Sequence, residues 1–273
     1  MAGLEELRDL AAGAAETGGR IVREGAERRA GGRPVLGGTE GVEATDKGLP
    51  GDYVTEVDLA SERTIRAMLE AATPDIPVLG EERGGELANR SWVVDPLDGT
   101  VNFIHGFWAV GVSVALVEEG RPLAGAVHAP FLHATWAASR GGGSFRRLAD
   151  RRAEPIRVSE RATERAVVGT GFPFRRKELV PRYLEAFRAA FGRFEDLRRP
   201  GAAALDLAWV ADGTFDGFFE LSLGSWDVAA GAVLIQEGGG LVTDWNGGPG
   251  FLRGDILAGS PAVHAALLEV VGA

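Results

Sequence analysis

Two aspartates separated by two residues, Asp95 and Asp98, mark the segment best suited to chemistry, which has the sequence Asp-Pro-Leu-Asp-Gly-Thr over residues 95–100. The apolar residues 92–94 predict a short buried strand before it, and the proline and glycine predict a turn. A tight turn at a strand end can direct two carboxylates and a backbone carbonyl at one point, which suits a hard metal cation. Taken alone, the segment also fits an ordinary surface turn, because Asp, Pro and Gly are common turn residues.

Three further acidic residues stand beside the ends of predicted elements. Glu81 follows the apolar strand predicted over residues 76–79, and Asp58 and Asp227 each stand at the start of a predicted helix. Each aspartate also fits the ordinary role of a helix N-cap, so neither is strong evidence by itself. Together with the acids of residues 95–100, they indicate one shared acidic site.

The elements that must position these acids change in pattern part-way along the chain. We expect one catalytic unit made of two halves, residues 1–150 and 151–273. The first half is predicted to hold two helices and a largely antiparallel set of strands, and the second half alternates strands with helices, which favours an α/β arrangement. Loops are predicted over the Gly-rich residues 31–51 and the Arg-rich residues 140–152. The predicted helices cover roughly residues 4–22, 58–72, 178–191, 202–211, 227–237 and 262–271.

Composition narrows the class of protein. The 273 residues are 45% hydrophobic and carry a formal net charge of −10, which fits a folded domain and argues against a general nucleic-acid binder. No apolar run reaches the roughly 20 residues of a membrane helix, and the acidic N-terminus is unlike a secretion signal. Cysteine is absent, which excludes disulfides and thiolate ligands. We therefore expect a cytoplasmic protein with no membrane partner, whose metal ligands are oxygen atoms.

The acidic segments resemble those of the inositol monophosphatase family in order and approximate spacing. The resemblance spans nearly the whole chain and is strongest where the Asp-Pro-Leu-Asp-Gly-Thr segment combines with the Trp-Asp-Val-Ala-Ala-Gly segment of residues 226–231. The other matching segments are residues 52–58, Gly-Glu-Glu at 80–82, Gly-Ala-Ala-Ala-Leu-Asp-Leu at 201–207 and Phe-Phe-Glu at 218–220. The resemblance implies a layered α-β-α-β-α sandwich, and a phosphomonoesterase that hydrolyses inositol-1-phosphate or a related polyol phosphate.

The resemblance also implies a set of metal ligands and a catalytic pair. The ligand positions of the family match Glu81, Asp95, Asp98, Asp227 and the carbonyl of Leu97, and they would hold two or three Mg²⁺ ions. Carboxylates about 4 Å apart repel by roughly 4 kcal/mol per pair at an effective dielectric of 20, so such a cluster requires cations. Asp58 and Thr100 match a pair that orients the attacking water, and Glu81 is counted with them as catalytic.

Substrate contacts are implied at four positions. By resemblance, Gly99 and Thr100 hold the phosphate, while Ala203 and Glu220 contact the substrate. Lys47 matches a lysine of a mobile loop near the metals. The family further implies inhibition by Li⁺ and assembly as a homodimer.

Three departures from the family pattern concern the substrate. Ala202 stands where the family often has a hydroxyl residue, Phe107-Trp108 where a proline is frequent, and the loop over residues 31–47 is longer than usual. Fructose-1,6-bisphosphatase, histidinol-phosphatase and nucleotide 3′-phosphatase activities remain open on the same fold. An alternative of a different class is a regulatory role through binding to another protein such as RNA polymerase.

Overall fold

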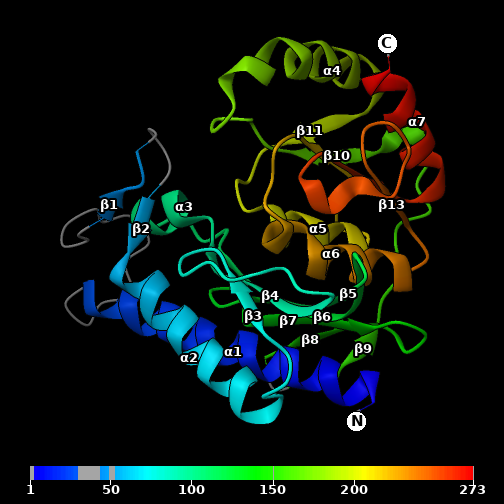
Figure 1. Ribbon diagram of the computed structural model, residues 1–273. Coiled ribbons are helices and arrows are strands. Elements are labelled where there is room, and N and C mark those ends of the chain that lie inside the picture. The colour runs from blue at the N-terminus through cyan, green and yellow to red at the C-terminus, as the bar shows by residue number, and fades with distance from the viewer. Residues whose placement is uncertain (1–2, 30–43, 49–52, 150, 273) are drawn as a thin grey trace.

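Two β-sheets and three pairs of helices alternate in five layers (Figure 1). The computed structural model describes residues 3–29, 44–48, 53–149 and 151–272. Helices α1 (Leu4–Arg29) and α2 (Glu56–Ala72) form one outer layer, and α4 (Val180–Arg193) and α7 (Pro261–Val271) form the other. Helices α5 (Ala203–Ala211) and α6 (Ser225–Glu237) lie between the sheets. The layered α-β-α-β-α arrangement expected from the sequence is confirmed.

The first sheet has seven strands in the order β3-β4-β5-β6-β7-β8-β9. Strands β3 and β4 are parallel, and every later pair is antiparallel. This pattern matches the antiparallel first half predicted from the sequence. The strands are β3 (Val78–Gly80), β4 (Arg90–Asp98), β5 (Gly111–Glu118), β6 (Arg121–Ala129), β7 (Ala134–Ser139), β8 (Gly143–Leu148) and β9 (Glu154–Pro155).

The second sheet has five strands in the order β11-β10-β12-β14-β13. The first three are mutually parallel, and the last two run antiparallel to their neighbours. The strands are β10 (Val167–Thr170), β11 (Asp196–Arg198), β12 (Gly217–Glu220), β13 (Leu241–Thr243) and β14 (Ile256–Gly259). The remaining elements are β1 (Ala44–Asp46), β2 (Tyr53–Thr55), α3 (Thr100–Ile104) and the 3-10 turns Thr163–Arg165, Lys177–Leu179 and Gly250–Arg253.

Three apolar clusters fill the spaces between the layers. The central helices α5 and α6 are apolar around most of their circumference, as expected of helices buried between two sheets, with Asp206 and Asp227 as buried exceptions. Trp92 packs toward α1 and α2, whereas its neighbour Val93 packs toward α5 and α6, because successive side chains of a strand face opposite sides. A third cluster, which includes Tyr183 and Leu267, joins the second sheet to α4 and α7. About 25 cal/mol of stabilisation is gained per Å² of apolar surface removed from water, so these interfaces hold the layers together.

Several predicted bounds were wrong. Helix α2 begins at Glu56, with Thr55 as its N-cap, so Asp58 is not the cap residue. Residues 143–148, within the stretch predicted as a loop, form β8 and pair with β7. Part of the other predicted loop, Ala44–Asp46, pairs with β2. Asp52 and most of residues 31–51 lie outside the described residues.

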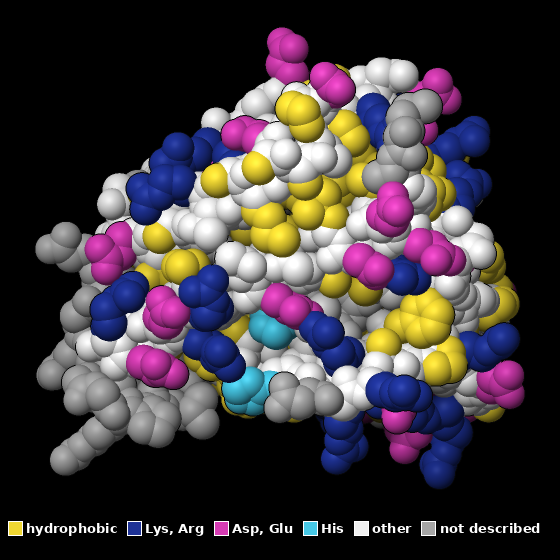
Figure 2. Space-filling model, turned by 90° about the horizontal axis from the view of Figure 1, so that it is seen from below, with side chains coloured by type: hydrophobic (Ala, Val, Ile, Leu, Met, Phe, Trp, Pro, Cys, Tyr) yellow, Lys and Arg dark blue, Asp and Glu magenta, His cyan; other side chains and the backbone are white. Residues whose placement is uncertain are grey.

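The outer face formed around α1 and α2 carries both signs of charge. Figure 2 shows Lys and Arg side chains interspersed there with Asp and Glu, rather than a field of one sign.

None of the helices in the described ranges combines the length and the apolar character that crossing a bilayer demands. The division of the chain at residue 150 stays a prediction.

Candidate metal and substrate site

A bulge in β4 brings two of the predicted ligands to the same side of the sheet. From Asp95 to Asp98 the strand advances three residues, while its partner β5 advances two, from Ser113 to Gly111. In a regular strand, residues three apart face opposite sides, and one extra residue corrects the direction. Pro96 is tolerated here because strand pairing at a bulge does not require the backbone N–H that proline lacks. The strand predicted to stop at residue 94 therefore continues through Asp98.

The residues that follow Asp95 lock this geometry. The Leu97 N–H donates to Asp95 Oδ1 at 2.9 Å, and the Leu97 carbonyl oxygen lies 3.2 Å from the Thr100 hydroxyl. Gly99 adopts φ of 87°, and a Cβ there would lie 2.9 Å from the carbonyl oxygen of Ala109. Only glycine fits that position without strain.

A buried carboxylate on α2 positions the loop that carries Glu81. Glu62 is fully buried and accepts hydrogen bonds from the backbone N–H groups of Glu82, at 2.8 Å, and Arg83, at 3.1 Å. Arg66, one turn along the helix, donates its Nε to Glu62 at 2.8 Å. The loop after β3 is therefore held by a hydrogen-bonded ion pair and not by its own turn alone.

The same ion pair extends to the strand itself. Arg66 donates to the carbonyl oxygens of Val78, at 2.8 Å, and Gly84. A Cβ on Gly80 would lie 2.5 Å from the carboxyl carbon of Glu62, so this glycine leaves room for the carboxylate. Glu81 thus leaves the strand end in a direction that α2 determines.

Asp58 and Thr100, the predicted catalytic pair, are in contact. Asp58 is the third residue of α2 and accepts from the N–H of Thr55 at 2.9 Å and from its hydroxyl. The Thr100 hydroxyl lies 3.1 Å from the other carboxylate oxygen of Asp58. Burial raises the pKa of Asp58 to about 6, although the hydrogen bonds from Thr55 and Thr100 lower it. At neutral pH Asp58 is therefore mostly ionised and can accept from Thr100.

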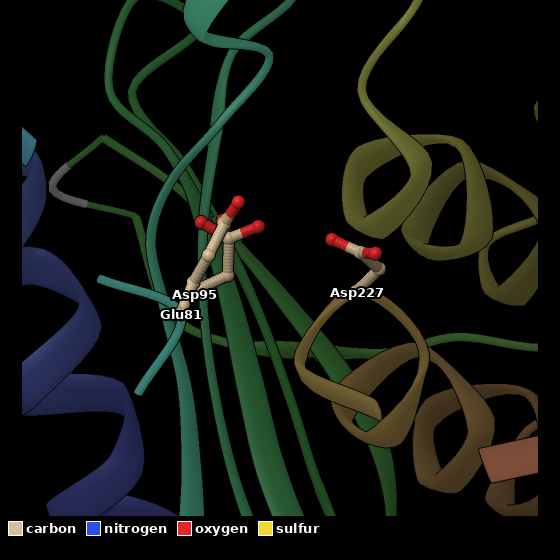
Figure 3. A group of neighbouring side chains, drawn as sticks. All are labelled: Glu81, Asp95 and Asp227. Atoms are coloured by element: carbon tan, nitrogen blue, oxygen red, sulfur yellow. The ribbon is translucent and has the colours of Figure 1, made fainter. Parts of the chain in front are cut away.

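Asp227 reaches the acidic cluster from the central layer. It is the third residue of α6 and accepts from the N–H of Gly224 at 2.6 Å. The carboxylates of Glu81 and Asp95 point toward the carboxylate of Asp227 across the space between β4 and α6 (Figure 3). One oxygen from each of these three carboxylates lies within 4.8 Å of the others. Asp98 is directed separately, because its Oδ2 accepts from the N–H of Ala204 near the start of α5, at 2.7 Å.

The electrostatics of the cluster favour bound cations. Burial, followed by the charges of Glu81, Asp98 and Asp227, raises the pKa of Asp95 well above its ordinary value. Burial and then the charge of Glu81 raise the pKa of Asp227 to about 6. Buried like charges raise each other's pKa, and a divalent cation relieves that cost. Closely spaced oxygen donors of this kind match Mg²⁺ in hardness.

The cluster opens into a pocket of about 270 Å³. All the predicted site residues except Asp58 and Lys47 line it. Glu220, the last residue of β12, and Ala203, the first of α5, lie on the pocket wall. Asp58 lies behind Thr100. Lys47 contacts Glu81 at 3.3 Å and Glu82 at 2.6 Å through its Nζ.

The pocket also contains cations that the sequence analysis did not identify. Arg175 and Arg199 both line it, each with its guanidinium 5.1 Å from the ring centre of a phenylalanine, Phe174 and Phe172 respectively. The sequence did hold a signal, since Gly-Phe-Pro-Phe-Arg at residues 171–175 begins one residue after the strand predicted over residues 167–169. Glycine and proline after a strand indicate a loop at the sheet edge, where ligands bind.

Comparison with known proteins agrees with this geometry. Residues 3–272 match the sequence profile of the inositol monophosphatase family. The chain belongs to the inositol monophosphatase family. It is 43% identical over 242 residues to an inositol-1-monophosphatase of Rhizobium meliloti, covering 86% of this chain and 88% of that protein. It is also 47% identical over 229 residues to the Nus factor SuhB of Pseudomonas aeruginosa, covering 81% of this chain and 83% of that protein.

The fold of this inositol monophosphatase family member matches solved structures over nearly its full length. An inositol monophosphatase from Anabaena superposes with a TM-score of 0.82 and 30% identity, covering 99% of this chain and 97% of that one. The extragenic suppressor protein suhB from Bartonella henselae gives a TM-score of 0.85 with 35% identity, covering 97% of this chain and 98% of that chain. A solved structure named as an inositol monophosphatase and one named as a suhB protein therefore share this architecture.

Proposed function

We propose that the protein is a Mg²⁺-dependent phosphomonoesterase that hydrolyses inositol-1-phosphate or a related polyol phosphate. The observation that carries the proposal is the meeting of Glu81, Asp95 and Asp227 in one pocket, beside Asp98 and the Thr100–Asp58 pair. Family membership supports phosphatase chemistry of this kind. Two or three Mg²⁺ ions, when bound, supply Lewis acidity and a water of lowered pKa.

The residues of the chain account for the remaining roles. Glu81, Asp95, Asp98, Asp227 and the carbonyl of Leu97 would hold the ions. The Thr100 hydroxyl donates its hydrogen to Asp58, so the lone pairs of the Thr100 oxygen are available to orient a water molecule. Glu81 assists from the other side of that water. The water oxygen bonds to phosphorus, and the bond from phosphorus to the alcohol oxygen breaks. One proton of the water ends on the alcohol and the other stays with the phosphate, so the products are the free alcohol and hydrogen phosphate.

The substrate is held from two directions. Gly99 and Thr100 bound the phosphate position, because both line the pocket next to the acidic cluster. Ala203 and Glu220 bound the alcohol side, where the Glu220 carboxylate can accept hydrogen bonds from ring hydroxyls. Lys47, through its contacts with Glu81 and Glu82, adds positive charge beside the cluster.

Asp95→Asn tests the metal requirement. The variant keeps the shape of the side chain and removes a charge from the centre of the cluster, so we expect turnover to fall at least roughly a hundredfold. Phosphate release from inositol-1-phosphate over a Mg²⁺ series measures it, with Asp75→Asn, an exposed aspartate outside the pocket, as the control. Near-wild-type turnover by the Asp95 variant at saturating Mg²⁺ would falsify the ligand set.

The same assay distinguishes the related activities. Fructose 1,6-bisphosphate, histidinol phosphate and nucleotide 3′,5′-bisphosphates are the comparison substrates, and inositol-1-phosphate is expected to give the highest kcat/KM. Inhibition by Li⁺, assembly as a homodimer and a cytoplasmic location stay predictions.

A second candidate function is the binding of a transcription protein. It is supported by the 47% identity to the Nus factor SuhB of Pseudomonas aeruginosa. A pull-down with the Asp95→Asn protein as bait separates the two functions, because a binding role does not need an active metal site. Specific capture of RNA polymerase by both wild type and variant supports this role, and its absence from both contradicts it.

A further inference from the structure

Arg175 joins the second half of the chain to the acidic cluster. It lies in the segment between β10 and α4, and its guanidinium contacts Glu81 Oε1 at 3.2 Å. The Glu81 side chain is 13% exposed and that of Arg175 is 33% exposed, so the pair is partly shielded from water. The carboxylate that the proposed function assigns to a cation therefore already has an internal positive partner.

The charge of Arg175 reaches further acids of the pocket. It lowers the pKa of Asp227 and that of Glu220, against the larger effect of burial on both groups. The guanidinium also packs against the Phe174 ring, whose centre lies 5.1 Å from the guanidinium carbon. Arg175 thus lies where its charge offsets part of the repulsion within the cluster.

Lys47 also contacts Glu81, but its position differs. Its Nζ lies 2.6 Å from Glu82 and 3.3 Å from Glu81, so Glu82 is the nearer carboxylate. A divalent cation that binds Glu81 therefore leaves Lys47 with its nearer partner. Lys47 and Arg175 both contact Oε1 of Glu81, so a cation at this oxygen adds a third positive charge and repels both. It competes with Arg175 for this oxygen, while Lys47 keeps its contact with Glu82.

We propose that Arg175 is an internal counter-ion that the first divalent cation displaces from Glu81. The inference rests on the proposed function, since it requires a cation site at Glu81. Displacement has two consequences. Cation binding is weakened by the contact that must be broken, and the displaced guanidinium is left in the pocket beside Phe174, within the site that receives an anionic phosphate.

Mg²⁺ binding to protein stripped of metal by chelation, measured by calorimetry without substrate, tests the exchange. Arg175→Gln removes the competing charge, so we expect Mg²⁺ to bind roughly twofold to fivefold more tightly than to wild type, the range of a partly exposed ion pair. Arg175→Lys keeps a charge at this position and should stay near wild type. Arg199→Gln is the matched control, since Arg199 lines the same pocket but forms no ion pair with a carboxylate of the described residues.

The melting temperature provides a second measurement. Without Mg²⁺, Arg175→Gln leaves the acids less compensated, so its melting temperature should be lower and its rise on adding Mg²⁺ larger than in wild type. Equal or weaker Mg²⁺ binding by Arg175→Gln overturns the exchange while leaving the metal site intact. A wild-type protein that binds no Mg²⁺ overturns the proposed function, and the exchange with it. Tighter binding by Arg199→Gln to the same degree also overturns it, because the effect would then be one of general charge.

Discussion

Glu220 shows how the absence of a side chain on one residue lets another residue reach the pocket. A Cβ on Gly171, just after β10, would lie 2.1 Å from an oxygen of the Glu220 carboxylate. The glycine therefore provides the space that the carboxylate occupies. No hydrogen bond from the described residues reaches this carboxylate, and burial raises its pKa well above the ordinary value. A buried acceptor of this kind gains most from a ligand that supplies donors.

Glu220→Gln is expected to act mainly on the binding of the alcohol part of the substrate. Donated hydrogen bonds from ring hydroxyls favour the ionised form of Glu220 against the effect of burial, and each contributes about 1.5–3 kcal/mol to a charged acceptor. The amide cannot ionise, so KM for inositol-1-phosphate should rise roughly tenfold. The turnover number should change less, since the residue lies away from the proposed position of phosphorus. Steady-state kinetics separate the two, and Gly171→Ala should give a similar rise in KM by displacing the same carboxylate.

Wild-type selectivity gives the complementary measurement. Fructose 1,6-bisphosphate places a second anion near Glu220, with no metal between them, so its kcat/KM should be lower than that of inositol-1-phosphate. A preference for the bisphosphate in wild type, or an unchanged KM in Glu220→Gln, contradicts this role.

Among the elements, α2 has a part in the site that its sequence does not reveal. Its residues Asp58 and Glu62 lie one turn apart on the same buried face, one toward Thr100 and the other beneath the loop of Glu81. One helix therefore sets the position of both the predicted catalytic pair and a predicted metal ligand. Sequence analysis assigned Asp58 to the catalytic pair by resemblance, but it did not identify Glu62.

Glu62→Gln tests that role. The amide cannot pair with Arg66 and accept both backbone N–H groups as the carboxylate does, so we expect a loss of about 3 kcal/mol in the free energy of unfolding. We also expect Mg²⁺ to bind roughly tenfold more weakly, because Glu62 would no longer fix the loop that orients Glu81. Calorimetry and chemical denaturation measure the two effects. Glu70→Gln, an exposed glutamate on the same helix, should change neither. A stability loss without any change in Mg²⁺ affinity would assign Glu62 to the fold alone.

The elements that sequence reasoning located and those it missed differ in where their stability comes from. The central helices α5 and α6 were predicted as helix-like segments that alternate with strands, a pattern visible in their own residues. Strand β8 was missed because its arginines are typical of a solvent-exposed loop. Arg146 pairs with Asp212, and Arg147 with Glu16, so the polar side chains of this strand are matched by distant residues. The β4 bulge depends likewise on pairing with β5, which no local pattern contains.

The acids of the candidate site were predicted more fully than the residues that hold them in position. The acids stand in short segments whose order and spacing are visible in the sequence. The positions of Arg175 and Arg199 in the pocket depend on the meeting of segments that are far apart in the chain. The Glu62–Arg66 pair has the ordinary i,i+4 spacing of a helix, but its contacts with the loop after β3 join residues that no local sequence pattern connects.

At the scale of the whole molecule, the site lies where the first sheet and the central helices meet. The loop after β3 supplies Glu81, β4 supplies Asp95 and Asp98, and α6 supplies Asp227 from the layer between the sheets. A cation bound by these acids links two layers of the sandwich. Its binding should therefore stabilise the folded chain as a whole.

The balance between proton and metal binding predicts a pH-dependent effect of Mg²⁺ on stability. Burial raises the pKa of Asp58 and that of Asp227 to about 6, and the pKa of Glu82 to about 7, whereas unfolded carboxyl groups titrate near pH 4. Between these values the folded chain holds more protons than the unfolded chain, so stability falls as pH rises from about 4 to 7. Without Mg²⁺, the melting temperature should therefore be lower at pH 8 than at pH 5.

Mg²⁺ should oppose this fall, because it binds the ionised carboxylates that the fold otherwise keeps protonated. At about one hundred times its dissociation constant, a ligand adds roughly 2.7 kcal/mol of stability, which is about 5 °C or more for a chain of this size. The gain should be large at pH 8, small at pH 5, and much reduced in Asp98→Asn at both. Thermal unfolding followed by circular dichroism measures it, with NaCl of equal ionic strength as the control. A gain that is as large at pH 5 as at pH 8, or that NaCl reproduces, would mean that the ion screens surface charge and does not bind this cluster.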